Sequence, residues 1–153
     1  MNKKVLLIAE IGWNHFGDIE LAKKMIDAAK LSGADFAKFQ TWSVSRLKKG
    51  VWDNDGRREI YNKAYLTDAM YEELYNYSKS LDLKCFASVF SDEDYNRLLK
   101  IDNEFIKIPS PEAHDLDLIK KSVKDFKNVV VSTGALKKNE LDYIIESVNE
   151  LVS

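Results

Sequence analysis

The stretch Ile8–Asp18, with the sequence IAEIGWNHFGD, decides the fold of this chain. An apolar run ends in the carboxylate Glu10, and a cluster of Gly, Asn and His residues follows at once. Four later apolar runs also end in polar residues. Because the carboxyl ends of parallel strands meet along one edge of a sheet, this pattern predicts one shared site built from five strands. The later strand ends are Lys38–Thr41, Ser88–Ser91, Lys107–Ser110 and Ser132–Gly134.

The composition is that of one ordinary globular domain. The chain has 153 residues, of which 45% are hydrophobic and 31% are charged, and its net charge is -2. This balance predicts binding neither to nucleic acid nor to an acidic membrane. Every apolar run is shorter than the roughly 18 residues that a membrane span needs. We therefore expect a cytoplasmic protein.

Strand and helix patterns alternate along the chain. Asp18, Thr67 and Ser91 are typical helix N-caps, and Gly33 is a typical helix stop. We expect strands at Val5–Glu10, Phe36–Thr41, Leu83–Ser88, Phe105–Ile108 and Asn128–Ser132. We expect helices at Ile19–Ser32, Asp68–Leu81, Ser91–Lys100, Asp115–Lys124 and Lys137–Val152.

Five successive strand–helix units predict an α/β fold with a parallel sheet and right-handed crossovers. One irregular segment, Trp42–Leu66, separates the second strand from the next helix. We predict a long loop there, since loops of this length are typically lids, substrate loops or disordered segments. The loop follows the same edge at which the polar strand ends gather.

These motifs resemble those of the sialic acid synthase family, which includes N-acetylneuraminate, legionaminate, pseudaminate and spore-coat synthases. The resemblance runs through the whole chain in the right order. Some positions depart from the family pattern: Ser88-Val89 replaces Thr-Pro, Pro111 replaces Gly and Ala135 replaces Met, while a hydroxyl is kept at each key place. The motifs that carry the resemblance are Ile8–Gly12 with Asn14, His15 and Gly17, then Gly33–Asp35 with Lys38–Thr41, Lys107–Ser110 with Glu112, and Ser132–Gly134.

The resemblance implies a parallel (β/α) barrel of TIM type, of which residues 1–153 supply about five of the eight units. The chain is then the N-terminal portion of a phosphoenolpyruvate-dependent synthase barrel. Strands six to eight, the family's metal-binding histidines and its antifreeze-like domain fall outside this portion. We expect the open edges of such a sheet to be covered by a partner chain or by a homo-oligomer, or else the isolated portion to be poorly stable.

The resemblance also implies a reaction. Phosphoenolpyruvate condenses with an N-acylhexosamine such as N-acetylmannosamine, phosphate is released, and a nonulosonic acid forms. A divalent metal, Mn or Mg, is expected to polarise the sugar aldehyde, with ligands outside this chain. The residues implied to bind phosphoenolpyruvate are Lys38, Ser88, Lys107, Ser110 and Ser132. The residues implied to be catalytic, facing the sugar or ordering the site, are Glu10, Gln40 and Glu112.

The two lysines can also be argued from the residues themselves. If Phe39 packs under the helices, strand alternation points Lys38 into the interior, and Lys107 has the same parity between its apolar neighbours. A buried charge is costly unless something pairs with it. Two inward ammonium groups on alternate strands would repel each other, and a bound dianion would relieve both. One such lysine alone would be interpreted as a side chain that reaches out to water.

Several assignments stay open at the level of sequence. Glu10 either faces the sugar or pairs with a lysine, such as Lys38, for structural reasons. Serines at strand ends are also typical of caps and turns. His15 and His114 lack metal-ligand spacing, so we assign no metal ligand. We expect a structural hydrogen-bonding role, with approach to the sugar site as the alternative for His15.

Two other functions compete with the synthase hypothesis. The first is a related phosphoenolpyruvate-dependent sugar-phosphate synthase or aldolase, which would need arginines for a second phosphate. The second is a non-catalytic truncated barrel that acts as a binding or scaffold module. Under the synthase hypothesis as well as its competitors, we expect this chain alone to have little or no condensation activity. The arginines that the sequence offers are Arg46, Arg57, Arg58 and Arg97, and of these only the loop pair could serve a second phosphate.

Overall fold

The computed structural model describes residues 5–42, 50 and 54–152. The described residues form a five-stranded sheet in which the hydrogen-bonded order follows the chain, β1-β2-β3-β4-β5. A sequential order without reversal is typical of a barrel and differs from the doubly wound arrangement. The parallel α/β class is therefore confirmed. The elements are β1 Ile8–Gly12, α1 Ile19–Leu31, β2 Phe36–Gln40, α2 Arg57–Ala64, α3 Asp68–Ser80, β3 Lys84–Ser88, α4 Asp92–Ile101, β4 Phe105–Ile108, the 3₁₀ turn η3 Ser110–Glu112, α5 Leu116–Asp125, β5 Asn128–Val131 and α6 Lys138–Val152.

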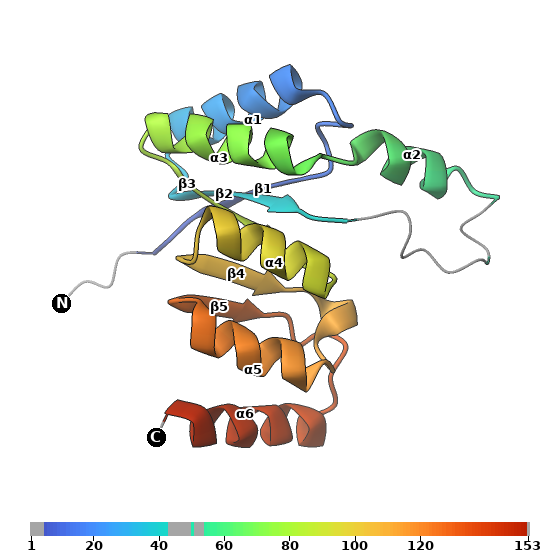
Figure 1. Ribbon diagram of the computed structural model, residues 1–153, viewed down its shortest axis with the longest axis vertical. Coiled ribbons are helices and arrows are strands. Elements are labelled where there is room, and N and C mark those ends of the chain that lie inside the picture. Colours follow the sequence, from blue (N-terminus) through green and yellow to red (C-terminus); the bar gives the residue numbers. More distant parts are fainter. Residues whose placement is uncertain (1–4, 43–49, 51–53, 153) are drawn as a thin grey trace. The chain divides into compact units, whose positions relative to one another are not determined.

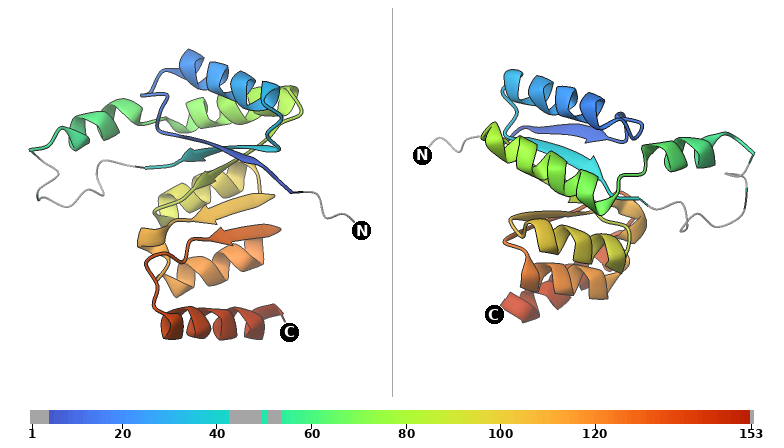
Figure 2. Two further views of the ribbon diagram at one scale, coloured as in Figure 1. Left: turned by 180° about the vertical axis from the view of Figure 1, so that it is seen from behind. Right: turned by 45° about the horizontal axis from the view of Figure 1, so that its top comes forward.

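The described residues fall into two compact units, Met1–Phe86 (unit 1) and Ala87–Ser153 (unit 2). In unit 1, β1 and β2 pair in parallel, with Ile8 opposite Phe36 and Glu10 opposite Lys38. Helices α1 and α3 pack side by side, as both views of Figure 2 show. Apolar side chains from these elements fill the interior of the unit. The fully buried ones include Ala22, Ile26, Phe39, Leu74 and Phe86.

Helix α1 begins where the sequence predicts. The side chain of Asp18 accepts hydrogen bonds from the backbone N–H groups of Glu20 and Leu21, which satisfies two donors that the first turn leaves unpaired. The last turn carries Lys30, whose charge suits the negative end of the helix dipole.

We expect Asp18→Ala to lower the free energy of unfolding by about 1 kcal/mol, because both cap hydrogen bonds are lost. Asp18→Asn keeps a capping oxygen and should lose no more than about half of that amount. Urea unfolding followed by circular dichroism measures both variants. An Asp18→Ala protein as stable as the wild type would contradict the capping role.

In unit 2, β4 and β5 pair in parallel, with Ile106 opposite Val129 and Lys107 opposite Val130. Helix α5 packs against β5 on one side and α6 on the other. Ser91 caps α4 by accepting a hydrogen bond from the N–H of Asp94, as the sequence predicts. The fully buried apolar side chains of this unit include Leu98, Ile106, Ile108 and Ile119.

The first strand begins later than predicted. Val5, Leu6 and Leu7 precede β1, and each is more than half exposed, at 77%, 55% and 55%. The N–H of Leu7 donates to the side chain of Asp35 at 2.9 Å. The strand pairing starts only with Ile8 opposite Phe36, and before it the Leu7 carbonyl accepts hydrogen bonds from the N–H groups of Asp35 and Phe36. The predicted strand Val5–Glu10 is therefore wrong at its start and ends two residues too early.

The predicted loop Trp42–Leu66 is only partly tested. Residues 43–49 and 51–53, which include Trp52, lie outside the described residues. The rest contains helix α2. The residue before this helix, Gly56, has a φ of 81°, in the left-handed region. Only Ala64 of this helix is buried, so the segment has almost no apolar stripe that a sequence pattern can reveal. The loop prediction is wrong for Arg57–Ala64.

Candidate functional site

Glu10 and Lys38 form an ion pair at adjacent positions of β1 and β2. The Lys38 Nζ lies 2.5 Å from the Glu10 Oε2. The Lys38 side chain is 9% exposed and the Glu10 side chain 52%. The prediction that Lys38 points inward is confirmed, and of the two interpretations left open for Glu10 the structure shows the pairing with Lys38. A buried ammonium group is stable only with such a partner, whereas the carboxylate stays open to a ligand.

Gly12 leaves room for two polar side chains. A Cβ atom there would lie 3.4 Å from the Glu10 Oε1 and 3.9 Å from the Gln40 Nε2. The strand pairing shifts register between Glu10 and Gly12, and Gly12 has a φ of 57°, a conformation that favours glycine. The Gln40 carbonyl accepts a 2.6 Å hydrogen bond from the Tyr71 hydroxyl, which fixes the end of β2. The side chains of Glu10 and Gln40 thus both lie next to Gly12.

His15 is completely buried in the loop between β1 and α1. Its Nδ1 accepts a 3.0 Å hydrogen bond from the N–H of Gly17, so the neutral ring carries its proton on Nε2. Its ring lies 5.8 Å from that of Phe39. Burial lowers the pKa of His15, and the backbone of Gly12 offsets only part of this effect. The structural role expected for His15 is confirmed.

This lowered pKa predicts a specific loss of stability in acid. The folded protein resists protonation of His15, whereas the unfolded chain binds the proton near pH 6.5, the ordinary value. The stabilisation is therefore complete above that pH and is lost as the pH falls through the folded-state pKa. Urea unfolding at about pH 7.5 and about pH 5.5 should show a smaller acid loss in His15→Gln than in the wild type. His114→Gln, at an exposed position, is the control and should keep the wild-type loss.

A second cluster lies in unit 2, around Lys107. The Lys107 Nζ donates to the Ser132 Oγ at 2.5 Å and to the Ile108 carbonyl at 2.7 Å. Ser88, 3% exposed, lies opposite Lys107 in the pairing of β3 with β4. The structure therefore brings Ser88, Lys107 and Ser132 together, as predicted. The half-buried ammonium group is held at the carboxyl end of β4 by neutral oxygens.

Ser110 belongs to the same end of unit 2. A Cβ atom at Gly134 would lie 3.9 Å from the Ser110 Oγ, so Ser110 adjoins the turn that follows Ser132. Glu112 stands two residues further along η3 and is half-buried. Its N–H donates to the Pro109 carbonyl. The structure thus places Glu112 on the turn that carries Ser110, and its catalytic role stays a prediction.

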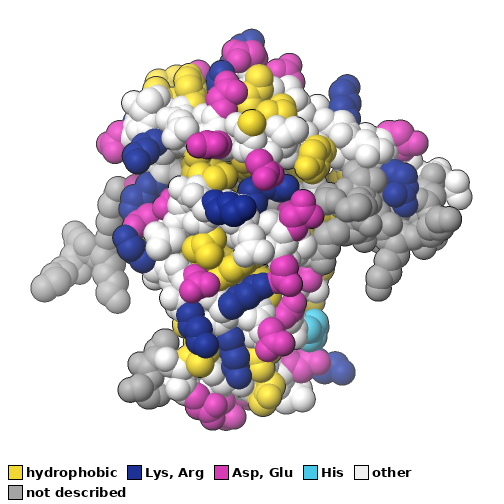
Figure 3. Space-filling model, viewed as in Figure 1, with side chains coloured by type: hydrophobic (Ala, Val, Ile, Leu, Met, Phe, Trp, Pro, Cys, Tyr) yellow, Lys and Arg dark blue, Asp and Glu magenta, His cyan; other side chains and the backbone are white. Residues whose placement is uncertain are grey.

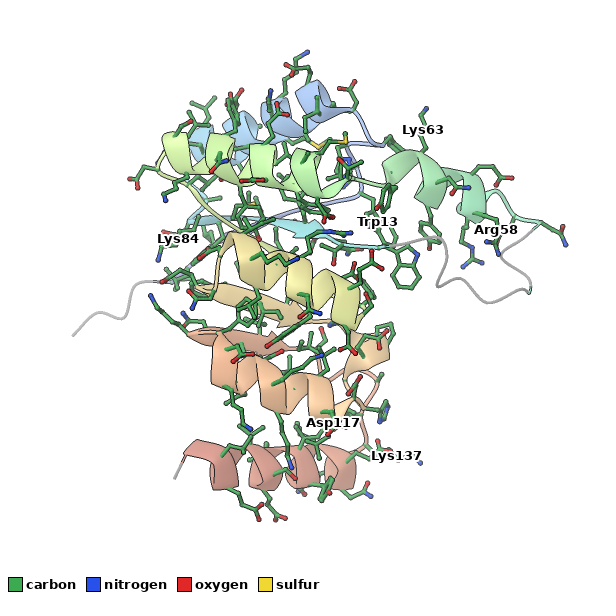
Figure 4. The ribbon with its side chains drawn as sticks, in the orientation of Figure 1. Trp13, Arg58, Lys63, Lys84, Asp117 and Lys137 are labelled. Carbon is green, nitrogen blue, oxygen red and sulfur yellow. The ribbon has the colours of Figure 1, made fainter. Side chains whose placement is uncertain are left out.

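Sequence reasoning missed an aromatic cluster in unit 1. The Trp13 ring contacts those of Trp42 and Tyr61, with centroids 6.0 Å and 4.6 Å apart. Figure 4 shows Trp13 between the end of β2 and helix α2. The available signal was the position of two tryptophans two or three residues after Glu10 and Gln40. The third ring could not be found because α2 was expected to be loop.

The surface carries no large region of one charge on the face that Figure 3 shows, since basic and acidic side chains are interspersed there. Among the helices that the structure describes, none is long and apolar enough to cross a membrane. The described residues also contain no group of three or more His, Cys, Asp or Glu side chains that could hold a metal ion. The resemblance places the ligands of the expected divalent metal outside this chain, so that metal stays a prediction.

A parallel sheet with sequential strand order and with charged side chains at its carboxyl ends defines an enzyme of the (β/α) barrel class. More specifically, the chain belongs to the NeuB family, whose model matches residues 25–152. It is 34% identical to the pseudaminic acid synthase of Campylobacter jejuni over 97% of this chain and 47% of the relative. It is 32% identical to the N,N'-diacetyllegionaminic acid synthase of the same species, again over 97% and 47%.

The solved structures agree with this family. The N-acetylneuraminic acid synthetase of Leptospira borgpetersenii matches with a TM-score of 0.89 and 27% identity, over 99% of this chain and 52% of that one. The chain spans about half the length of the relatives that it matches. The resemblance to the sialic acid synthases is confirmed at the level of the family and the fold.

Proposed function

We propose that this chain forms part of a synthase that condenses phosphoenolpyruvate with an N-acylated hexosamine to a nonulosonic acid. The observation that carries the proposal is the Lys107–Ser132 contact, which holds an ammonium group and hydroxyls at one strand end. Phosphoenolpyruvate has a phosphate and a carboxylate, and both bind best to fixed cations and hydrogen-bond donors. The names of the relatives support the product class.

The reaction balances without a redox partner. Carbon three of phosphoenolpyruvate attacks the aldehyde carbon of the open sugar, forming a C–C bond, and the aldehyde oxygen takes up a proton. Water adds to carbon two, and phosphate leaves with cleavage of the C–O bond. The Lys107 charge would stabilise the anionic substrate, and Ser88, Ser110 and Ser132 would donate hydrogen bonds to it.

The residues of unit 1 have separate proposed roles. The exposed carboxylate of Glu10 would accept hydrogen bonds from the sugar's hydroxyls or amide, and the Gln40 amide would keep that carboxylate in place. Lys38 holds Glu10 in the structure, and its binding to phosphoenolpyruvate stays a prediction. Glu112 is proposed to face the sugar. The divalent metal also stays a prediction, with no step here assigned to it.

Two of the four arginines, Arg57 and Arg97, argue against an acceptor with a second phosphate. Arg97 is 6% exposed at its side chain and lies 3.4 Å from the buried carboxylate of Asp94. Arg57 donates to Asp55 at 2.6 Å. Arg46 lies outside the described residues. Because carboxylates already hold Arg57 and Arg97, neither offers a ready site for a sugar phosphate.

Isothermal titration of the chain with phosphoenolpyruvate tests the proposal. We expect phosphoenolpyruvate to bind more tightly than inorganic phosphate or pyruvate, because the site would engage both anionic groups. Binding should weaken as salt is raised, since the contacts are ionic. Equal affinity for all three ligands, or no detectable heat with phosphoenolpyruvate, would overturn the proposal.

A further inference from the structure

The aromatic cluster of unit 1 joins three separate elements. Trp13 comes from the loop after β1, Trp42 from the segment that follows β2, and Tyr61 from α2. The Trp42 and Tyr61 centroids are 5.9 Å apart, so each ring contacts both others. All three residues remain half-buried, whereas core rings such as Phe39 and Phe86 are 0% and 1% exposed. These three residues are therefore less completely buried than the rings of the core.

Two of the three rings follow the polar residues Glu10 and Gln40 closely along the chain. Trp13 is the third residue after Glu10, and Trp42 the second after Gln40. Each residue of extended chain spans about 3.5 Å, so the backbones of Trp13 and Glu10 lie within about 10 Å of each other. The Glu10 side chain is 52% exposed despite its ion pair. A ligand the size of a hexose that contacts Glu10 is therefore within reach of the rings.

The two features complement one kind of ligand. A carboxylate accepts hydrogen bonds from hydroxyl and amide groups, and aromatic faces pack against C–H groups. An N-acylated hexosamine carries both, because its ring face and its acyl methyl group are apolar while its rim is polar. Sites with apolar walls and a few placed polar groups are typical of small-molecule recognition.

We propose that Trp13, Trp42 and Tyr61 form a platform for the N-acyl methyl group and the apolar ring face of the acceptor sugar. The proposal rests on the proposed function and specifies how the acceptor is recognised. The platform selects acylated amino sugars over plain hexoses, because a hexose has no acyl methyl group to pack on the rings. Binding to it depends little on salt, since the sugar is neutral.

Saturation-transfer NMR with N-acetylmannosamine and the unmodified chain is the first test. We expect the strongest transfer at the acyl methyl protons, and affinity for mannose about tenfold lower. Trp13→Ala should weaken N-acetylmannosamine binding about tenfold, which is about 1.4 kcal/mol. Tyr143→Ala, at an exposed position on α6, is the control and should bind as the wild type. Equal affinity for mannose and N-acetylmannosamine would overturn the proposal that these rings form a platform.

Two further variants guard against a folding artefact. Trp13→Phe keeps an aromatic face and should retain most of the affinity, whereas Tyr61→Leu keeps apolar bulk and should lose affinity. Thermal unfolding of each variant shows whether the fold is intact. If an intact Trp13→Ala protein binds the sugar as the wild type, the platform is wrong. Titration of the same samples with phosphoenolpyruvate separates the two proposals. If phosphoenolpyruvate does not bind, the proposed function is wrong. If it binds while the sugar result fails, only the platform proposal is wrong.

Discussion

Lys107→Met should weaken phosphoenolpyruvate binding by about tenfold to hundredfold. A hydrogen bond to a charged group contributes about 1.5–3 kcal/mol, and each 1.4 kcal/mol is tenfold in affinity. Met keeps most of the length and apolar volume of the side chain but removes the ammonium group that Ser132 now contacts. The loss should therefore come from the charge. Isothermal titration at constant salt measures it.

The control for this experiment is Lys124→Met. Lys124 is an exposed lysine in the last turn of α5, so its replacement changes the net charge by the same amount without altering the cluster. We expect its affinity to stay within about twofold of the wild type, because exposed charges are well screened. Ser132→Ala should show an intermediate loss, since it removes one hydroxyl and leaves the ammonium group. If Lys107→Met and Lys124→Met bind phosphoenolpyruvate equally well, the assignment of Lys107 is wrong.

Gly17→Ala should be the most destabilising of the glycine substitutions in unit 1. A Cβ atom at Gly17 would overlap the carbonyl oxygen of Lys63 and lie 3.2 Å from its carbonyl carbon. Gly17 also has a φ of 79°, which costs an L-residue about 1–2 kcal/mol. Backbone atoms cannot turn aside as a side chain does, and overpacking adds about 1–3 kcal/mol. We expect a total loss of about 3 kcal/mol.

Gly33→Ala provides a matched control. Gly33 has a similar φ of 82°, but nothing lies within 4 Å of its Cβ position. Its substitution should therefore cost only the conformational part, about 1 kcal/mol. Urea unfolding measures both variants, and the difference between them isolates the clash with α2. Equal losses would show that the contact between Gly17 and Lys63 does not hold in solution.

The sequence predicted most of the strands and helices because their signals are local. Apolar periodicity placed α1 and α3 within one residue of their observed ends, and Asp18 and Ser91 cap helices as expected. The failures also have local reasons. The first strand was placed too early because its apolar residues are exposed, and α2 was missed because it buries almost nothing.

The candidate site was predictable in composition but not in its contacts. Strand parity correctly indicated that Lys38 points inward, and the polar strand ends marked Ser88, Lys107 and Ser132. No pattern indicated that Lys107 contacts Ser132 rather than another hydroxyl. For Glu10, the sequence left two interpretations open, and the strand register decided that it pairs with Lys38.

The amino-acid sequence by itself determined the parallel α/β class, the helix caps and the set of polar residues at the strand ends. Each of these depends on neighbours a few positions away, through side-chain alternation and local hydrogen bonds. Only the tertiary structure decided which of those residues meet. Glu10 and Lys38 are brought together by strand pairing, and the rings of Trp13, Trp42 and Tyr61 by the packing of α2. Such contacts depend on register and on helix placement, which no local pattern encodes.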